Sequence, residues 1–144
     1  MPADRRPLPQ LLGEARRWFD QALPAALEAA GTTPLTPAQT QLFAALDDTG
    51  TTVAELARRT GVTRQSAHQT AHSLITAGLL EQTPDPTSGR RWLLRRTATG
   101  DHAHHQAVHA LATLESHLAG RLGTETVTAL RTALEQDWGE PPRG

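Results

Sequence analysis

Hydrophobic and polar positions follow the period of an α-helix along most of this chain, and residues 63–80 show it most clearly. Apolar positions there recur every three or four residues, as on one face of a helix, and they are Ala67, Ala71, Leu74, Ile75, Gly78 and Leu79. Thr63 is a suitable N-cap, Gly61 permits a tight turn before it, and Gly78 closes the helix. This stretch therefore predicts an amphipathic helix with one buried face.

The opposite face of this helix carries hydrogen-bonding side chains and no carboxylate. Its residues are Arg64, Gln65, His68, Gln69, His72 and Thr76. A short helix is predicted just upstream, roughly over residues 53–60, with a capping box at residues 52–55. Two helices joined by a tight, glycine-containing turn, with donors and acceptors on the second, favour helix-turn-helix recognition of DNA. An ordinary solvated surface helix is the alternative, since periodicity alone does not separate the two.

Two further helices are predicted before this pair. Residues 8–30 carry a wide, continuous apolar stripe, and Pro24 within it is expected to kink or divide the helix. Thr36 and Gln39 form a capping box that opens the next helix, which runs to about Leu46. The stripe of residues 8–30 exceeds what one small core needs, so we expect a partner subunit to bury the remainder.

The hydrophobic period changes after the helix pair. Residues 81–83 and 91–96 read as two short strands, and the turn-forming residues 84–89 lie between them. A hairpin that follows a helix-turn-helix is a wing. Arg90 and Arg91 come just past its predicted tip, from where they could reach the minor groove or a phosphate.

Two helices are predicted after the wing. Thr97 or Thr99 caps the first, which runs to about Gly120, and Thr124 caps the last. Their apolar stripes are Val108, Leu111, Leu114, Leu118 and Leu122 in the first, and Val127, Leu130, Leu134 and Trp138 in the second. These stripes, like that of residues 8–30, are expected to lie in a dimer interface.

Charge is distributed unevenly along the chain. The formal net charge of the 144 residues is −1. Residues 58–96, however, hold seven Arg against two acids, a charge of +5, while the rest holds seven Arg against thirteen acids, a charge of −6. One basic segment in an otherwise acidic protein is the electrostatic pattern of a module that faces DNA.

Length and composition exclude several classes of protein. A chain of 144 residues is long enough for one domain with a real core. No apolar run approaches the ~20 residues of a membrane span and no signal peptide is recognisable, so we predict a cytoplasmic protein with no membrane partner. The absence of cysteine excludes disulfides, thiolate catalysis and Cys-ligated zinc. Because phosphate-loop, H-E-x-x-H and G-x-S-x-G motifs are also absent, neither enzymatic activity nor a cofactor is expected.

The order of elements and three segments of sequence resemble the MarR (multiple-antibiotic-resistance regulator) family of bacterial transcription factors. The segments are LTPAQ at residues 35–39, VAELARRTGVTRQSAHQTAHSLITAGLLE at 53–81 and DPTSGRRWLLRRTATG at 85–100. The resemblance covers roughly residues 8–138, and Arg90 matches the wing arginine of the family. Ser88 replaces the family's usual Asp, which helps to orient that arginine. Arg96 replaces its usual Leu, which predicts either an extra cation near DNA or an exposed strand end.

The resemblance implies a mainly α (α+β) fold, in which a winged helix-turn-helix with a two-stranded wing is flanked by N- and C-terminal dimerisation helices. It implies one domain over residues 1–144, with residues 8–30 and 98–138 forming the homodimer and residues 36–97 binding DNA. The implied function is that of a dimeric, sequence-specific and ligand-responsive repressor. A two-fold dimer would present two recognition helices to successive major grooves of a pseudo-palindromic operator.

The predicted DNA contacts lie on the second helix of the pair and on the wing. They are Thr63, Arg64, Gln65, Ser66, His68, Gln69, His72, Arg90 and Arg91. The first turns of a recognition helix reach base edges, where Gln pairs with adenine and Arg pairs with guanine or a phosphate. A winged helix that only binds protein is an alternative, which the salt dependence of binding would distinguish.

An aromatic group and a histidine are candidates for an effector pocket. His104 falls on the apolar face of its helix, where it is either a core or interface residue or part of a pocket. By resemblance, such a pocket for a small-molecule effector lies between the first, second and fifth helices and the base of the wing. The candidate lining residues are Trp18, Phe19, Phe43 and His104.

His102, His105 and His109 recur at spacings of three and four, within roughly 60° of one another around their helix. This spacing would permit a zinc site, and a zinc-responsive regulator is an alternative function. Neither a cysteine nor a nearby histidine from the early helices supplies a fourth ligand, which leaves only an acidic side chain. A solvated polar face is therefore favoured, and no metal is predicted.

Overall fold

The computed structural model describes residues 5–144, so residues 1–4 of the predicted domain lie outside the described residues. Its elements, in chain order, are α1 (Leu8–Ala29), α2 (Pro37–Ala45), α3 (Val53–Thr60), α4 (Arg64–Thr76), β1 (Leu80–Asp85), β2 (Ser88–Arg96), α5 (Ala98–Leu122) and α6 (Thr124–Glu135). The two strands pair antiparallel. The predicted α+β fold, a winged helix-turn-helix with a two-stranded wing, is confirmed. None of the helices within the described range is long and apolar enough to cross a membrane.

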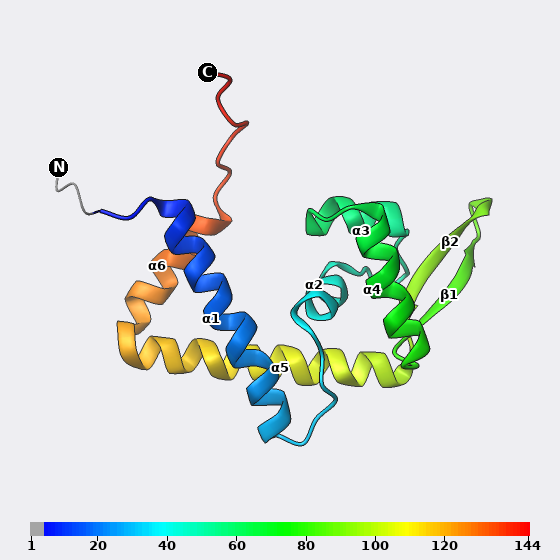
Figure 1. Ribbon diagram of the computed structural model, residues 1–144, viewed down its shortest axis with the longest axis horizontal. Coiled ribbons are helices and arrows are strands. Elements are labelled where there is room, and N and C mark those ends of the chain that lie inside the picture. Colours follow the sequence, from blue (N-terminus) through cyan, green and yellow to red (C-terminus); the bar gives the residue numbers. More distant parts are fainter. Residues whose placement is uncertain (1–4) are drawn as a thin grey trace.

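The helix α5 connects two parts of the molecule (Figure 1). At one end of α5 lie α2, α3, α4 and the β1–β2 hairpin, and at the other end lie α1 and α6. Helix α1 crosses α5 and continues through Pro24 as one helix, so the proline does not divide it. Leu23 and Leu27, which lie before and after Pro24, are both buried.

The core gathers apolar side chains from α1 to α5 and from the hairpin. Its largest fully buried side chains are Phe43, Leu27, Leu56, Leu74 and Leu94. The predicted apolar face of α4 is confirmed, because Ala67, Ala71 and Leu74 are buried, as is Leu79 beyond its end.

Only part of the stripe predicted for α5 faces the core, where Leu111 and Leu114 pack against the buried residues. Ala103 and Ala107 are its buried side chains, whereas Val108 and Leu122 of the predicted stripe are exposed. Ala103 and Ala107 share a helix face with Leu111 and Leu114, which follow at spacings of four and three residues, while Val108 lies off that face and Leu122 is the last residue of the helix.

Three of the predicted N-caps are confirmed. Thr36 forms a reciprocal capping box with Gln39, the Thr63 hydroxyl accepts from the Ser66 N–H, and Thr97 caps α5. The box predicted at residues 52–55 is only half formed, because the Glu55 carboxylate binds arginines instead of the backbone. The cap predicted at Thr124 is wrong: Gly123 occupies the N-cap position, and Thr124 is the first helical residue.

A close approach fixes α5 to the end of α4. The Thr97 hydroxyl donates to the Gly78 carbonyl at 2.7 Å and accepts from the Gly100 N–H at 3.0 Å. A Cβ on Gly100 would lie 1.8 Å from the Leu79 carbonyl oxygen. The segment from Thr97 to Gly100 therefore joins α4, the hairpin and α5 at one point.

Candidate nucleic-acid interface

The wing is longer than the sequence pattern indicates. Strands β1 and β2 replace most of the loop predicted at residues 84–89, and only Pro86 and Thr87 remain in the turn. The Asp85 carboxylate closes this turn by accepting from the Thr87 N–H at 2.9 Å and from its hydroxyl at 2.7 Å. The first of these bonds is the main cause of the lowered pKa of Asp85. Pro84 misled the prediction, since proline is tolerated in a strand whose edge is unpaired.

The register of the wing leaves its arginines out of the ladder. Pro84 pairs with Trp92 and Asp85 pairs with Ser88, so Gly89, Arg90 and Arg91 lie between the paired positions of β2. Arg90 and Arg91 are exposed, and within residues 5–144 neither of them forms an ion pair. Such a bulge turns side chains away from the sheet, and here it presents two free cations.

The polar face of α4 is open to solvent, as predicted. Its exposed members are Arg64, Gln65, Ser66, His68, Gln69 and His72. Thr63 is also exposed, but its hydroxyl oxygen is engaged as the helix cap. The face is therefore hydrated and has its hydrogen-bonding groups available to an external partner.

A groove of about 630 Å³ separates α3 and α4 from the wing. Its cationic and aromatic lining comprises Arg58, Arg64, His68, Arg90, Arg91 and Trp92. Arg58 and Trp92 were not among the residues predicted to contact DNA. The two-residue alternation of side chains along β2 was the available signal for Trp92, because it places Trp92 on the same strand face as the buried Leu94.

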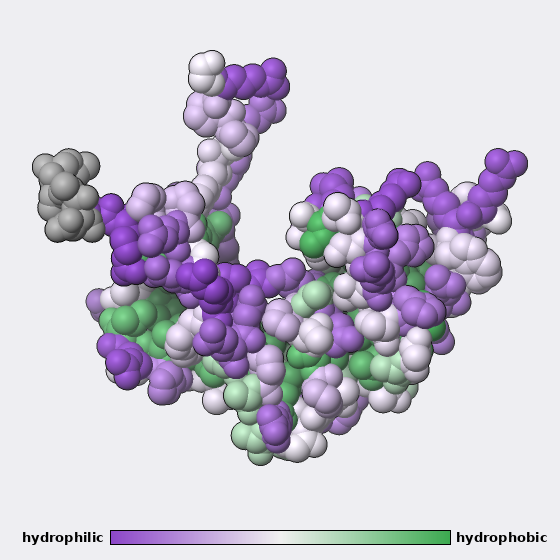
Figure 2. All heavy atoms as spheres, viewed as in Figure 1, coloured by the Kyte–Doolittle hydropathy of each residue, from purple (hydrophilic) through white to green (hydrophobic). Residues whose placement is uncertain are grey.

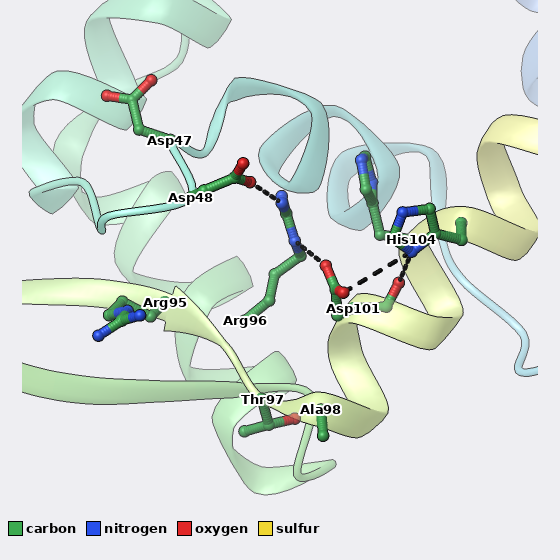
Figure 3. Close-up of a pocket in the computed structure, with 9 residues that line it drawn as sticks. Asp47, Asp48, Arg95, Arg96, Thr97, Ala98, Asp101 and His104 are labelled. Carbon is green, nitrogen blue, oxygen red and sulfur yellow. Dashed lines mark hydrogen bonds and ion pairs between the residues drawn. The ribbon is translucent and has the colours of Figure 1, made fainter.

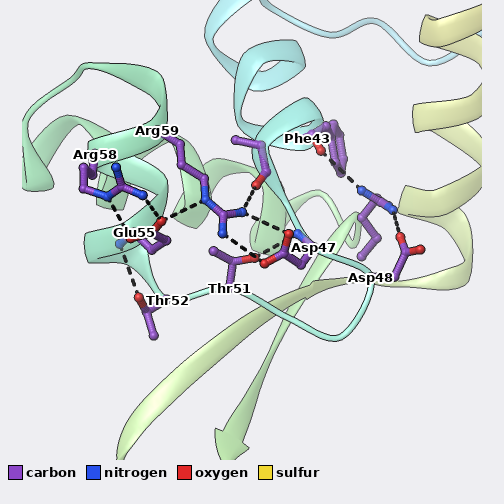
Figure 4. Close-up of polar contacts among 10 residues, drawn as sticks. Phe43, Asp47, Asp48, Thr51, Thr52, Glu55, Arg58 and Arg59 are labelled. Atoms are coloured by element: carbon purple, nitrogen blue, oxygen red, sulfur yellow. Dashed lines mark hydrogen bonds and ion pairs between the residues drawn. The ribbon is translucent and has the colours of Figure 1, made fainter. Parts of the chain in front are cut away.

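An ion-pair network holds α3, which forms one wall of this groove, against the end of α2 (Figure 4). Arg59 donates to both Asp47 carboxylate oxygens, at 3.0 and 3.1 Å, and to the Ala45 carbonyl at 2.8 Å. Hydrogen bonds from Arg58 and Arg59 lower the pKa of Glu55 to about 2, and those from Arg59 lower the pKa of Asp47. Arg59 therefore ties α3 to the end of α2, while Arg58 lines the groove.

Arg96 joins three elements on the opposite side of the wing base (Figure 3). Its guanidinium donates to Asp48 at 2.6 Å, to Asp101 at 3.2 Å and to the Phe43 carbonyl at 3.2 Å. The side chain is only 11% exposed. Neither expectation for this position is correct: Arg96 is neither an exposed strand end nor free to contact DNA, because it is held between α2, the following loop and α5.

The four candidate effector residues do not share one cavity. His104 lines a polar cavity of about 510 Å³ with Arg96 and Asp101, and burial is the main cause of its lowered pKa. Phe43 is fully buried, 6.1 Å from the His104 ring. Phe19 lines a separate cavity of about 320 Å³ between α1, α2 and α5, and Trp18 packs edge-on against Phe19 at 5.0 Å.

His102, His105 and His109 all lie along one groove between α1 and α5. The His105 Nδ1 is 2.8 Å from the Asp101 carbonyl oxygen of its own helix. Among residues 5–144, no group of three or more His, Cys, Asp or Glu side chains is arranged to hold a metal ion.

This geometry defines a class of protein, the winged helix-turn-helix proteins whose second helix is polar and whose wing is cationic. The model of the MarR family matches residues 33–91. An uncharacterized protein of Mycobacterium tuberculosis, Rv2011c, is 30% identical over 101 residues, which are 70% of this chain and 71% of that protein. The chain belongs to the MarR family, whose members are DNA-binding transcriptional regulators.

Two solved structures show how far the similarity extends. The Mycobacterium tuberculosis MarR family protein Rv2887, in complex with salicylic acid, is 27% identical, with a TM-score of 0.71 over 92% of this chain and 97% of that chain. The transcriptional repressor CouR, bound to a 23-mer DNA duplex, is 25% identical, with a TM-score of 0.76 over 89% of each chain. Both comparisons span the helices at both ends as well as the winged helix.

Proposed function

We propose that this protein is a homodimeric, sequence-specific repressor whose affinity for a pseudo-palindromic operator is lowered by a small molecule. The observation that carries this proposal is the joint exposure of the polar face of α4 and the unpaired wing arginines on either side of one groove. The similar repressor CouR is bound to DNA in its structure. An enzymatic role is not part of the proposal, since family members are regulators.

In this proposal α4 lies in a major groove and the wing reaches the adjacent minor groove. Gln65, Ser66 and Gln69 in the first turns of α4 read base edges, with Arg64, His68 and His72 beside them. Arg90 and Arg91 neutralise phosphates or sense groove width. Thr63 positions the helix through its cap, in which its oxygen accepts, and its hydroxyl hydrogen remains free to donate to a phosphate oxygen.

Dimerisation is supported by the apolar surface that one chain leaves uncovered. Helix α6 contributes no buried residue, and Leu130 and Leu134 remain 51% and 47% exposed. Figure 2 shows hydrophobic side chains gathered where α5 meets α6. We propose that α1, α5 and α6 bury this surface against a second copy, which sets the two recognition helices about one helical turn apart.

The cavity between α1, α2 and α5 is the proposed effector site. Its lining is mostly apolar, including Phe19, Leu23 and Leu111, and Arg16 at its edge is paired with Asp20 at 3.0 Å. A ligand there would contact both the dimerisation helices and α2, which packs on α4. Salicylate, which the Rv2887 structure contains, is a suitable probe.

The test begins with a footprint of the purified protein on DNA upstream of its own gene, followed by titration of that site at several salt concentrations. A protected two-fold site and a steep loss of affinity with salt are expected. Salicylate should weaken the complex, and Ala44→Trp, at an exposed position lining the cavity, should abolish that response. Absence of any protected site, or an affinity that salt leaves unchanged, would favour a winged helix that binds protein.

A further inference from the structure

In the proposed binding mode, part of a DNA duplex would have to occupy the groove between α4 and the wing. One sugar–phosphate strand always separates a major groove from the neighbouring minor groove. If α4 enters the first and the wing reaches the second, that strand must cross the groove between them. This inference therefore rests on the proposed binding mode.

Charge on the walls of the groove suits this occupant. Arg64 stands on the α4 side and Arg90 and Arg91 on the wing side. No carboxylate in the described part of the chain forms an ion pair with any of these three guanidinium groups. Glu55 also lines the groove, but its carboxylate is paired with Arg58 and Arg59, so phosphates on a strand that crosses the groove would meet cations on both sides.

Trp92 is the largest apolar side chain that lines the same groove. The indole is 56% exposed although Leu94, two residues along the same strand face, is fully buried. A large aromatic side chain left open between cations is costly to hydrate and is typical of a contact surface. Its neighbours in the groove include Gln82 of β1 and Val53 of α3.

We propose that Trp92 is a further DNA-contacting residue, whose indole packs against a deoxyribose of the strand that crosses this groove. The sugar presents C–H groups between successive phosphates, and those phosphates are held by Arg64 on one side and by the wing arginines on the other. The indole N–H is a donor that can reach a phosphate oxygen. The contact carries no base information, so it strengthens binding to any duplex.

A contact of this kind has a signature that separates it from the arginine contacts. Removing an arginine that neutralises one phosphate lowers the slope of log affinity against log salt by about 0.9. Removing an apolar contact lowers affinity and leaves that slope unchanged, because no counterion is released. Trp92→Ala and Arg90→Ala are therefore a matched pair on one strand.

The experiment is a salt titration of wild type, Trp92→Ala, Trp92→Phe and Arg90→Ala on the footprinted operator and on a scrambled duplex. Trp92→Ala should bind both duplexes about 5- to 10-fold more weakly with the wild-type slope. Trp92→Phe, which keeps a flat ring, should recover most of the loss. Adding either duplex should change the tryptophan emission of wild type, and this change should be lost in Trp92→Phe.

Two results would overturn the proposal for Trp92. One is that Trp92→Ala binds both duplexes with wild-type affinity and that Trp92→Phe shows the same emission change as wild type. The other is a fall in salt slope in Trp92→Ala equal to that of Arg90→Ala, which would mean that Trp92 only positions the arginines. In both cases loss of binding in Arg90→Ala would leave the proposed function intact, whereas DNA binding unchanged in every variant would reject the function itself.

Discussion

At the scale of single residues, the junction of α4, the hairpin and α5 depends on side chains that are small or short. Thr97 uses one hydroxyl both to cap α5 and to bind the Gly78 carbonyl. Gly100 is required because the Leu79 carbonyl occupies the place where a Cβ would be. This segment carries part of the resemblance to the MarR family, and the close approach of the Leu79 carbonyl is its steric reason.

Gly100→Ala tests this reason. The added methyl would meet backbone rather than a flexible side chain, so we expect the free energy of unfolding to fall by about 3 kcal/mol or more. Gly120→Ala is the control in the same helix, because nothing lies within 4 Å of a Cβ there. It should stabilise the protein by up to about 1 kcal/mol through helix propensity. Equal denaturant midpoints for the two variants would contradict the steric account.

His104 gives a pH dependence whose sign follows from its surroundings. Burial and then the Arg96 guanidinium and His105 lower its pKa below 6.5, while Asp101 and Asp48 oppose the shift. The unfolded chain therefore binds a proton at a higher pH than the folded chain does. Its contribution to stability is complete above pH 6.5 and is lost as the pH falls from there toward the lowered pKa.

We expect wild type to lose more stability than His104→Gln when the pH is lowered from about 7.5 to about 5.5, since only wild type carries this proton. Urea unfolding at the two pH values measures the difference, and the other six histidines are common to both proteins. A larger loss in the variant would show that the imidazole is stabilised in its charged form instead.

At the scale of elements, local signals predicted the helices well and the wing less well. The α4 helix carries its cap, its apolar face and its closing glycine within one short segment, so its pattern was sufficient. The wing bulge depends on pairing across the hairpin. Arg96 depends on Phe43 and Asp48, which lie 53 and 48 residues away, and no local pattern contains such partners.

Arg96→Ala measures how strongly this arginine joins β2, α2 and α5. The change leaves the part-buried Phe43 carbonyl without its donor, while the exposed Asp48 and Asp101 carboxylates can be hydrated, so we expect a loss of about 2 kcal/mol in the free energy of unfolding. Arg95→Ala is the adjacent control, since Arg95 is exposed and forms no ion pair in the described residues. Its effect should stay within about 0.5 kcal/mol. Equal losses would mean that net charge, and not the network, stabilises this region.

At the scale of the whole molecule, one chain does not bury the apolar surface that its terminal helices carry. The apolar stripes predicted for the helices at both ends of the chain stay partly exposed. Helix α6 is the extreme case, because none of its residues is buried. The excess of apolar positions could be read from the sequence, whereas the exposure of Val108 and Leu122 could not, because it depends on where the other helices pack against α5.

Dimerisation can be tested by sedimentation at micromolar concentration. Wild type should have twice the 15.5 kDa mass of one chain. Leu130→Glu combined with Leu134→Glu should give a folded monomer with weaker operator binding, while Thr132→Glu, on the other side of α6, should leave the dimer intact. A monomeric wild type would rule out the two-fold arrangement.

The proposal that the exposed face of α4 reads DNA sequence is tested most directly by comparing Gln65→Ala and Gln69→Ala on operator and scrambled duplexes across a salt series. The account predicts a loss of about 1–3 kcal/mol on the operator, little change on the scrambled duplex and an unaltered salt slope. Arg90→Ala should weaken both duplexes and lower the slope. Equal losses of the glutamine variants on both duplexes would contradict the claim, because the helix would then position the protein on DNA without reading it.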